Sequence, residues 1–314
     1  MCAMSFFNYE TDLLLITAAS GKQAAALLPH VVKQWRRLRL NVSSTESANE
    51  LRENYPDAEV TQHDLADAQA CKLMLDGVSA CYLITPPFHA KESQCGINVI
   101  DAALAQKDAF KFLLHSSVIF PIKHKMLNHD SKRVIEEYLL ESTLPYAILE
   151  PTHLMESVDL VGMIKSKATV MPRLWNPDTK FTLVSTRDVA EVAAKVLSHP
   201  ERHLYATYQL VGTRAPMSYR DAADLISKEL GRDLKIERKT IEEGVQMFTS
   251  LITHGHPERA PFETRQAAAR MFMYYNDKGL IGNPNVLEML LGREPLGYLD
   301  WIRLTKKEVD ADSP

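Results

Sequence analysis

The sequence predicts an α/β fold: a Rossmann-type doubly wound parallel sheet, followed by a smaller and mostly helical C-terminal lobe. Two observations support this prediction. Over the first half of the chain, short β-rich runs alternate with helical patterns, which is typical of parallel strands joined by right-handed crossovers. In addition, an apolar run at residues 13–16 enters a turn of small residues and an apolar-periodic helix follows, as at the start of a dinucleotide-binding βαβ unit.

Strands and helices alternate regularly before residue 150. Pro29 lies inside the first helix and should kink it or end it early, because proline has no backbone N–H. Asn128 or Asp130 can cap the fifth helix, which carries an apolar stripe. The predicted strands are residues 12–18, 37–42, 58–61, 79–85, 110–116 and 146–149. The predicted helices are residues 21–35, 45–54, 67–75, 91–106 and 128–142.

Beyond Pro151 the alternation weakens. Asp188 should open a helix rich in alanine and valine, and Ser218 should cap another. We predict a dinucleotide-binding core at residues 1–150 and a substrate lobe at residues 151–314, interleaved with late sheet strands and without a clean linker. The predicted elements of this part are strands 181–185 and 206–211 and helices 188–198 and 219–230, with a helical pattern at the C-terminal end.

Composition indicates a globular protein and argues against several ligands. The net charge of −4 disfavours nucleic acid, because phosphate binding needs a concentrated basic face. No apolar run approaches the ~20 residues that cross a bilayer, so no membrane insertion is expected. His254 and His256 have no third ligand nearby in the sequence, so no metal site is predicted. We expect a cytoplasmic location, because no secretory signal is visible and the four cysteines lack paired spacing: Cys2, Cys71, Cys81 and Cys95.

The turn after the first strand is a candidate cofactor site. In a dinucleotide loop, glycines allow a tight turn, a close approach of phosphate and close packing of the helix. Here only Gly21 remains, and Ala18 and Ala24 occupy the other two positions. A phosphate could still bind at the helix N-terminus, although a domain that has lost its nucleotide is the alternative. The candidate cofactor-binding residues are Thr17, Ala19, Ser20, Gly21, Lys22 and Gln23.

The ends of the next strands suggest which cofactor binds. No carboxylate follows the second strand, so NAD lacks its usual ribose anchor, and NADP is mildly favoured. Ser43 and Ser44 could donate to a phosphate, or they could simply cap the next helix. Asp64, beside Leu65, can accept a hydrogen bond from an adenine amino group, or it is only a turn residue. Thr85 and Pro86 would line the middle of the cofactor, although they could merely end the fourth strand.

The chain resembles the NmrA-like family, which are atypical members of the short-chain dehydrogenase/reductase superfamily. The order and spacing of its motifs carry the resemblance over nearly the whole chain, and its tail is similar to that of fungal members. The resemblance implies a Rossmann core with a smaller C-terminal lobe and a preference for NADP. Family members include reductases, isomerases and redox-sensing regulators. The matching segments are 17–23, 63–65, 83–87, 96–103, 116–118, 129–132, 136–139, 144–156 and 274–293.

The superfamily's catalytic core is a serine with Tyr-x-x-x-Lys, in which the lysine holds the nicotinamide ribose and the tyrosine exchanges a proton. By resemblance, Lys132 matches the lysine, and Ser116 or Ser117 matches the serine. Asn128 occupies the tyrosine position and cannot act as a general acid, although it can hydrogen-bond a carbonyl. His129 is adjacent, but helical spacing turns it about 100° away from residue 128. Its alternative role is that of a capping or surface residue.

Four further side chains are candidates by the family's layout. His153 and Glu156 should lie near the nicotinamide end, and Lys123 and His124 should overhang the same cleft. Each could supply an acid or a base, although a lone histidine is more often structural. The late half is also rich in methionine and aromatic residues, which form either a core or a pocket for a bulky hydrophobic substrate.

Together with the resemblance, the sequence predicts an NADP(H)-dependent oxidoreductase that acts on a bulky hydrophobic small molecule, and the similarity to fungal members implies a place in fungal secondary metabolism. Because the catalytic tyrosine is absent, chemistry on an already activated substrate is favoured over unaided ketone reduction. Two alternatives stay open. One is an isomerase or cyclase that uses the same cleft without net redox change, and the other is a cofactor-sensing regulator that binds a protein partner.

Overall fold

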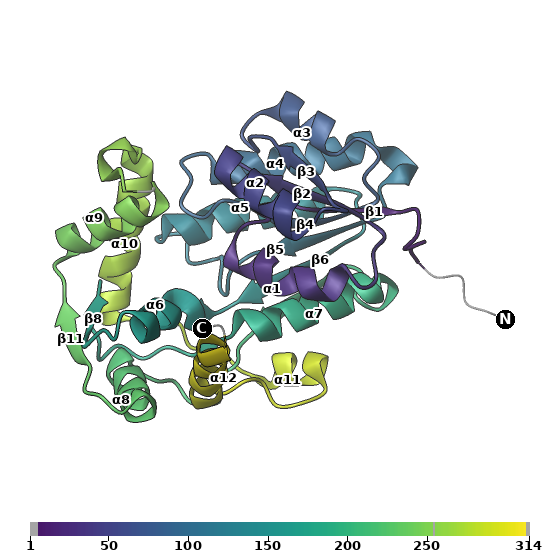
Figure 1. The fold of residues 1–314 in the computed structure, drawn as a ribbon. Helices are drawn as coiled ribbons and strands as arrows, with labels where there is room; N and C mark the ends of the chain where they lie inside the picture. The colour runs from purple at the N-terminus through teal and green to yellow at the C-terminus, as the bar shows by residue number, and fades with distance from the viewer. Residues whose placement is uncertain (1–5, 254, 312–314) are drawn as a thin grey trace. The chain divides into compact units, whose positions relative to one another are not determined.

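The computed structural model describes residues 6–253 and 255–311, and its largest element is a seven-stranded sheet (Figure 1). The strand order is β10-β6-β5-β4-β1-β2-β3, and the registered pairs from β3 to β6 are parallel. This is the doubly wound order, in which the chain reverses direction across the sheet between β1 and β4. The predicted α/β fold is confirmed. The strands are β1 Leu13–Ile16, β2 Arg37–Val42, β3 Glu59–Gln62, β4 Ala80–Ile84, β5 Phe112–Ser116, β6 Tyr146–Pro151 and β10 Ala206–Leu210.

The chain forms two compact units. The first, called unit 1, comprises residues 1–122, 129–150 and 189–208, and the second, unit 2, comprises residues 123–128, 151–188 and 209–314. The helices of unit 1 or shared with it are α1 Lys22–Val31, α2 Thr45–Asn54, α3 Ala68–Met74, α4 Glu92–Ala105, α5 Leu127–Glu141 and α7 Thr186–Ser198. Unit 2 contains β7 His153–Leu154, α6 Leu160–Lys165, β8 Val170–Arg173, β9 Leu183–Val184, α8 Tyr219–Leu230, β11 Lys235–Arg238, α9 Ile241–Ile252, α10 Phe262–Asp277, α11 Asn285–Leu291 and α12 Tyr298–Ala311.

One hydrophobic cluster of unit 1 lies between the central strands and helices α3, α4 and α5. Strands β1, β4, β5 and β6 are buried on both faces, which explains their nearly continuous apolar sequences. In Figure 1, α1 and α7 lie on the opposite side of the sheet from α3 and α4. Gly96 lets α4 approach α5 closely, because a Cβ at this position would lie 2.5 Å from Cγ1 of Ile135.

Several boundaries differ from the predicted ones. Helix α1 continues through Pro29 but ends at Val31, four residues before the expected end. Helix α5 begins at Leu127, so Asn128 and Asp130 lie inside it and neither is its N-cap. Helix α7 begins at Thr186 rather than at Asp188. By contrast, Ser218 caps α8 as predicted, and it does so in a reciprocal capping box with Asp221.

Two of the residues discussed above fall outside the part of the chain that the structure describes. Cys2 and His254 lie outside the described residues. Within residues 6–253 and 255–311, no helix combines the length and the hydropathy that a membrane span needs.

Candidate functional site

The loop between β1 and α1 has the backbone shape that glycine favours, although alanine occupies its first position. Ala18 adopts a φ of 48°, in the left-handed region. Gly21 precedes α1 in an extended conformation, and its N–H donates to the Ala18 carbonyl at 2.9 Å. A Cβ at residue 21 would lie 3.1 Å from the same carbonyl oxygen, so a side chain there would be crowded. The tight turn therefore survives the loss of two glycines.

The N-terminus of α1 is accessible. Its N-cap is Gly21, which has no side chain to cap the first-turn N–H groups, and Ser20, Gly21 and Lys22 are exposed. Ala19 and Ala24 are fully buried, so their methyl groups pack inside unit 1 and leave the surface of the loop open. A diphosphate group fits such an exposed helix start, because backbone N–H groups and the helix dipole both favour an anion.

Two of the predicted cofactor-binding residues use their side chains for hydrogen bonds within unit 1. The Thr17 hydroxyl donates to the Ile84 carbonyl at 2.8 Å and accepts from the Ile84 N–H at 2.8 Å, which ties β1 to β4. Gln23 Oε1 accepts from Ser116 Oγ at 2.8 Å and from the Tyr82 hydroxyl at 3.2 Å. Gln23 therefore joins α1 to β4 and β5, and it engages the Ser116 hydroxyl that the resemblance assigned to catalysis.

The residues expected to select the cofactor lie at the ends of β2 and β3. Ser44 caps α2 by accepting from the Ser47 N–H at 3.2 Å, whereas Ser43 is exposed. Asp64 is exposed and accepts from the Ala66 N–H at 2.8 Å, which leaves its second carboxylate oxygen for another donor. Leu65 is buried in the core of unit 1. The capping role proposed for Ser44 is thus the one that the structure shows.

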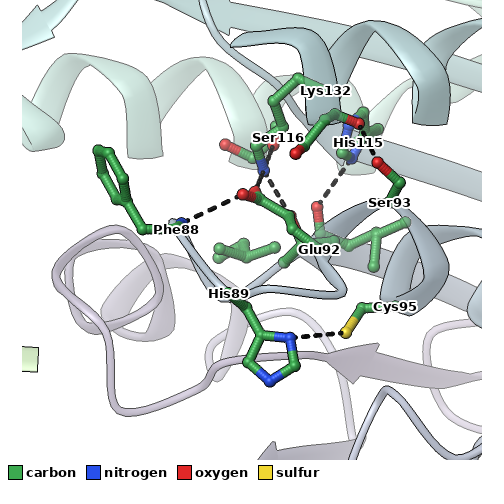
Figure 2. Close-up of polar contacts among 12 residues, drawn as sticks. Phe88, His89, Glu92, Ser93, Cys95, His115, Ser116 and Lys132 are labelled. Atoms are coloured by element: carbon green, nitrogen blue, oxygen red, sulfur yellow. Dashed lines mark hydrogen bonds and ion pairs between the residues drawn. The ribbon is translucent and has the colours of Figure 1, made fainter. Parts of the chain in front are cut away.

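Lys132 on α5 lies in a buried polar cluster at the carboxyl ends of β4 and β5 (Figure 2). Its Nζ is 2.5 Å from Thr85 Oγ1, 3.1 Å from Glu92 Oε1 and 3.2 Å from the Ser116 carbonyl oxygen. Lys132 is 8% exposed and Glu92 is 2% exposed. The ammonium group has three donors, so these three contacts use all of them.

Glu92 completes this cluster, and the motif search missed it. Its Oε1 accepts from Thr85 Oγ1 at 2.9 Å, and its Oε2 accepts from the Phe88 N–H at 3.2 Å. Glu92 stands in the first turn of α4, where a carboxylate is favoured by the helix dipole. One signal could have revealed its burial: residue 92 falls at helical spacing with Cys95, Gly96 and Val99, all of which are buried.

Glu136, one turn after Lys132 on α5, is a half-buried carboxyl that sequence reasoning missed. Its pKa is raised to about 7, chiefly by burial and to a smaller extent by the charge of Glu150. The Ser117 hydroxyl beside it and the Lys132 ammonium act in the opposite direction. Near neutral pH this carboxyl therefore exists in both protonation states. Ser117, the alternative catalytic serine, is buried and belongs to this second group of polar side chains.

The two histidines of this part of unit 1 are both fully buried. His129 lies with its Nδ1 3.1 Å from the Phe120 carbonyl oxygen, so its alternative role as a surface or capping residue is wrong. His115 lies on β5, with its Nδ1 3.3 Å from the Leu83 carbonyl oxygen. Burial and the nearby Lys132 charge hold the pKa of His115 well below its usual value, so its ring is neutral.

The remaining candidates belong to unit 2. Asn128 donates to Met271 Sδ at 3.7 Å, and Lys123 Nζ donates to the Tyr274 hydroxyl at 2.8 Å. His124 is exposed. His153 Nε2 lies 2.5 Å from the Tyr219 hydroxyl and 3.2 Å from Ser157 Oγ. Burial and the charge of Arg173 lower the pKa of His153 to about 3, so its imidazole is neutral.

Glu156 also lies in unit 2 and is held in place there. Its Oε1 accepts from Ser185 Oγ at 3.2 Å, from the Thr186 N–H at 3.1 Å and from Trp301 Nε1 at 3.1 Å. These three donors fix the position of the carboxylate group. Within unit 2, Glu156 therefore joins β9 and α7 to α12.

Comparison with known proteins supports the same fold. The sequence profile of the NmrA-like family matches residues 10–306. An NADPH-dependent quinone oxidoreductase from Escherichia coli, solved with NADPH, is 20% identical and superposes with a TM-score of 0.71 over 93% of this chain and 99% of the other. Triphenylmethane reductase from Citrobacter, solved with NADP(H), is 17% identical, with a TM-score of 0.71 over 93% and 99% of the two chains.

The third comparison is with a protein of a different kind. NmrA, a negative transcriptional regulator solved with NADP, is 15% identical and has a TM-score of 0.71 over 97% of this chain and 98% of the other. None of the curated protein sequences matches the chain. At these identities the solved structures demonstrate a shared fold but not a shared function. Whether the chain is a reductase or a regulator must therefore be argued from the chemistry of the site.

Proposed function

Because this chain belongs to the NmrA-like family, we propose that it is an NADP(H)-dependent oxidoreductase acting on a bulky, hydrophobic small molecule. Two of the solved structures with this fold are NADPH-dependent or NADP(H)-bound reductases, of a quinone and of a triphenylmethane dye. Both of those substrates are already activated toward hydride. The similarity of the tail to fungal members supports a place in fungal secondary metabolism.

The observation that carries the proposal is the shape of the β1–α1 loop. Ala18 keeps the left-handed backbone of a glycine, and Gly21 stands where an added Cβ would meet a carbonyl oxygen at 3.1 Å. The exposed start of α1 therefore remains able to hold a diphosphate through backbone N–H groups. Asp64, at the end of β3, can accept from an adenine amino group. When bound, NADP(H) would supply or accept a hydride.

The side chains of helix α5 limit the chemistry. Lys132 already uses its three donors on Thr85, Glu92 and the Ser116 carbonyl, so a ribose hydroxyl would have to replace one of these contacts. Asn128 can orient a carbonyl but cannot give up a proton. Glu136 is a carboxyl that can hold or release a proton near neutral pH. These properties support hydride transfer to an activated alkene, imine or carbonyl more than reduction of a simple ketone.

A second candidate is a regulator that senses the cofactor and binds a protein partner. One observation favours it: Lys132 is neutralised by Glu92, and asparagine replaces the tyrosine that Lys132 would activate. NmrA, which shares the fold, is a transcriptional regulator. A non-redox isomerase or cyclase that uses the same residues is a further alternative, since it too would not require the tyrosine.

Calorimetric titration with NADPH, NADP and NAD tests the proposal. We expect NADPH to bind, and NAD to bind more weakly, because no carboxylate follows β2 to receive the ribose hydroxyls. Gly21→Val should abolish binding by filling the cradle, whereas Ala25→Val, on the exposed side of α1, should leave it intact. Absence of binding by the wild-type protein would contradict both the oxidoreductase and the cofactor sensor.

Turnover then separates the two candidates. Oxidation of NADPH in the presence of quinones or triphenylmethane dyes, followed by nicotinamide absorbance, supports the oxidoreductase. Tight NADPH binding without turnover of any such acceptor, together with capture of a defined protein partner, would favour the regulator.

A further inference from the structure

Glu92, in the first turn of α4, is held through both of its carboxylate oxygens. Its Oε1 accepts from the Thr85 hydroxyl at 2.9 Å and lies 3.1 Å from Lys132 Nζ, and its Oε2 accepts from the Phe88 N–H at 3.2 Å. In Figure 2 this carboxylate lies between the Lys132 ammonium and the Phe88 backbone. The Glu92 side chain is 1% exposed, so it offers almost no surface to a ligand. Glu92 is therefore a negative charge at a fixed position.

The loop after β4 is closed by the same residue. Phe88 has a φ of 61°, in the left-handed region, where a bulky side chain is strained. Besides the side-chain contact to Phe88, the Glu92 N–H donates to the His89 carbonyl at 3.0 Å. The backbone and the side chain of Glu92 thus both hold this loop, which begins at Thr85. Because of these contacts, the carboxylate cannot follow an ammonium group that moves away from it.

Lys132 is the member of the pair that a ligand can touch, since 10% of its side chain remains exposed. Its three contacts differ in what their loss would cost. Loss of the Glu92 contact leaves a buried charge unpaired, and the Thr85 hydroxyl is the nearest acceptor, at 2.5 Å. The Ser116 carbonyl is neutral and, at 3.2 Å, the most distant of the three. An incoming hydroxyl therefore replaces the Ser116 carbonyl most easily.

Glu92 also determines the net charge around Lys132. Among the described residues, it is the one carboxylate within ion-pair distance of Lys132 Nζ. The Lys132 charge also acts on His115, which is neutral, and on the carboxyl of Glu136, one turn further along α5. At contact distance, the whole counter-charge of Lys132 thus comes from Glu92, and the pair together carries no net charge.

We propose that Glu92 is a positioning residue for the nicotinamide ribose, and that its charge allows unit 1 to bind the oxidised as well as the reduced cofactor. Glu92 and Thr85 hold two donors of the Lys132 ammonium and leave the third for a ribose hydroxyl. The nicotinamide ring is positively charged in NADP and neutral in NADPH, so a lysine without its counter-charge would disfavour the oxidised form. This inference rests on the proposed function, because it requires that NADP(H) binds.

The test compares the two redox forms of the cofactor. Calorimetric titration of the full-length protein at about pH 6.5, where lysine amines keep their proton, gives a dissociation constant for NADP and one for NADPH. Glu92→Gln leaves the ammonium without a counter-charge, and it should raise the ratio of the NADP constant to the NADPH constant by at least about threefold. Lys132→Met leaves the carboxylate, and it should lower the same ratio. General damage to the fold would weaken both forms together and would not move the ratio in opposite directions.

Three further variants serve as controls. The double variant Lys132→Met with Glu92→Gln should return the ratio to the wild-type value while both constants stay raised, since the charge is balanced but the ribose donor is gone. Thr85→Val removes a neutral contact and should raise both constants by the same factor. Glu137→Gln removes an exposed carboxylate from α5 and should change neither constant.

An unchanged ratio in Glu92→Gln would overturn the proposal while leaving the proposed function intact. If neither single variant folds, the double variant decides, because wild-type affinity of that variant for both forms would exclude a part for Glu92 and Lys132 in binding. Absence of binding of either form by the wild-type protein is a distinct result, and it would contradict both this proposal and the proposed function.

Discussion

At the scale of single residues, the ion pair of Lys132 and Glu92 gives Lys132 a structural role besides any role in cofactor binding. Both side chains are buried, and the carboxylate also receives the Thr85 hydroxyl and the Phe88 N–H. Removing one partner of a buried pair leaves the other charge unpaired in a poorly solvated site. Loss of cofactor binding in a Lys132 variant therefore cannot by itself be assigned to a lost ribose contact.

We expect Lys132→Met to lower the free energy of unfolding by about 3–5 kcal/mol, because it leaves the buried Glu92 carboxylate without its counter-charge. The double variant Lys132→Met with Glu92→Gln should recover most of that loss. Urea denaturation measures both. Arg133→Met is the control: Arg133 pairs with Glu137 at the surface of the same helix, so this change should cost much less stability than Lys132→Met. Equal costs for the two single variants would contradict the buried pair.

Glu136 should make the free energy of unfolding fall as the pH rises. Its pKa is raised from 4.5 to about 7, so between these values the native state holds a proton that the unfolded state has lost. Its contribution to stability is fully present below pH 4.5 and is lost as the pH rises through 7. Glu136→Gln should therefore stabilise the protein relative to wild type at pH 8, by on the order of 1–3 kcal/mol, and should have little effect at pH 4.5.

Denaturation curves at several pH values measure this effect. Glu137→Gln is the matched control, because Glu137 is the adjacent residue on α5 but is exposed. It should show no gain at pH 8. If the stability difference between wild type and Glu136→Gln does not change between pH 4.5 and pH 8, the raised pKa is wrong.

At the scale of elements, the β1–α1 loop stores backbone strain. Ala18 is held at a φ of 48°, which costs an L-residue on the order of 1 kcal/mol and costs glycine almost nothing. We expect Ala18→Gly to raise the free energy of unfolding by about 0.5–1 kcal/mol. Ala25→Gly, in the middle of α1, should lower it by about the same amount. Thermal unfolding of the two variants gives the signs, and a destabilising Ala18→Gly would refute the strained conformation.

The packing of α4 against α5 makes a second prediction at this scale. Gly96→Ala improves helix propensity, but its methyl group would lie 2.5–2.8 Å from three carbons of Ile135. Overpacking should therefore dominate and lower the stability by about 1–3 kcal/mol. In a double-mutant cycle with Ile135→Ala, the pair should cost less than the sum of the single changes. Additive costs would show that the two helices are not in this close contact.

At the scale of the whole molecule, the two units can be followed separately by tryptophan fluorescence. Trp35 belongs to unit 1, whereas Trp175 and Trp301 belong to unit 2. With Trp175 and Trp301 replaced by phenylalanine, the remaining signal reports on unit 1. NADPH at about 100 times its dissociation constant should raise the unfolding free energy reported by Trp35 by about 2.7 kcal/mol. No shift in the urea midpoint would contradict cofactor binding by unit 1.

The sequence by itself determined the fold class and most of the strands and helices of the parallel sheet. Residues 37–42 and 45–54 were predicted with their observed bounds, and Ser218 was identified as a cap, because periodicity and capping act within a few residues. The family motifs identified Lys132 and the β1–α1 loop in the same way. The short strands β8 and β11 were missed, since they pair only with each other and their patterns are brief.

Only the tertiary structure decided the state of the charged groups. Glu92 and Lys132, Glu136 and Glu150, and Arg173 and Tyr219 are separated by many residues, and crossovers between strands and helices bring each pair together. Whether such a group is charged, paired or without an acceptor depends on its burial and on distant neighbours, and neither is encoded locally. The residue types were visible in the sequence, but their pKa values and partners arise from the packed fold.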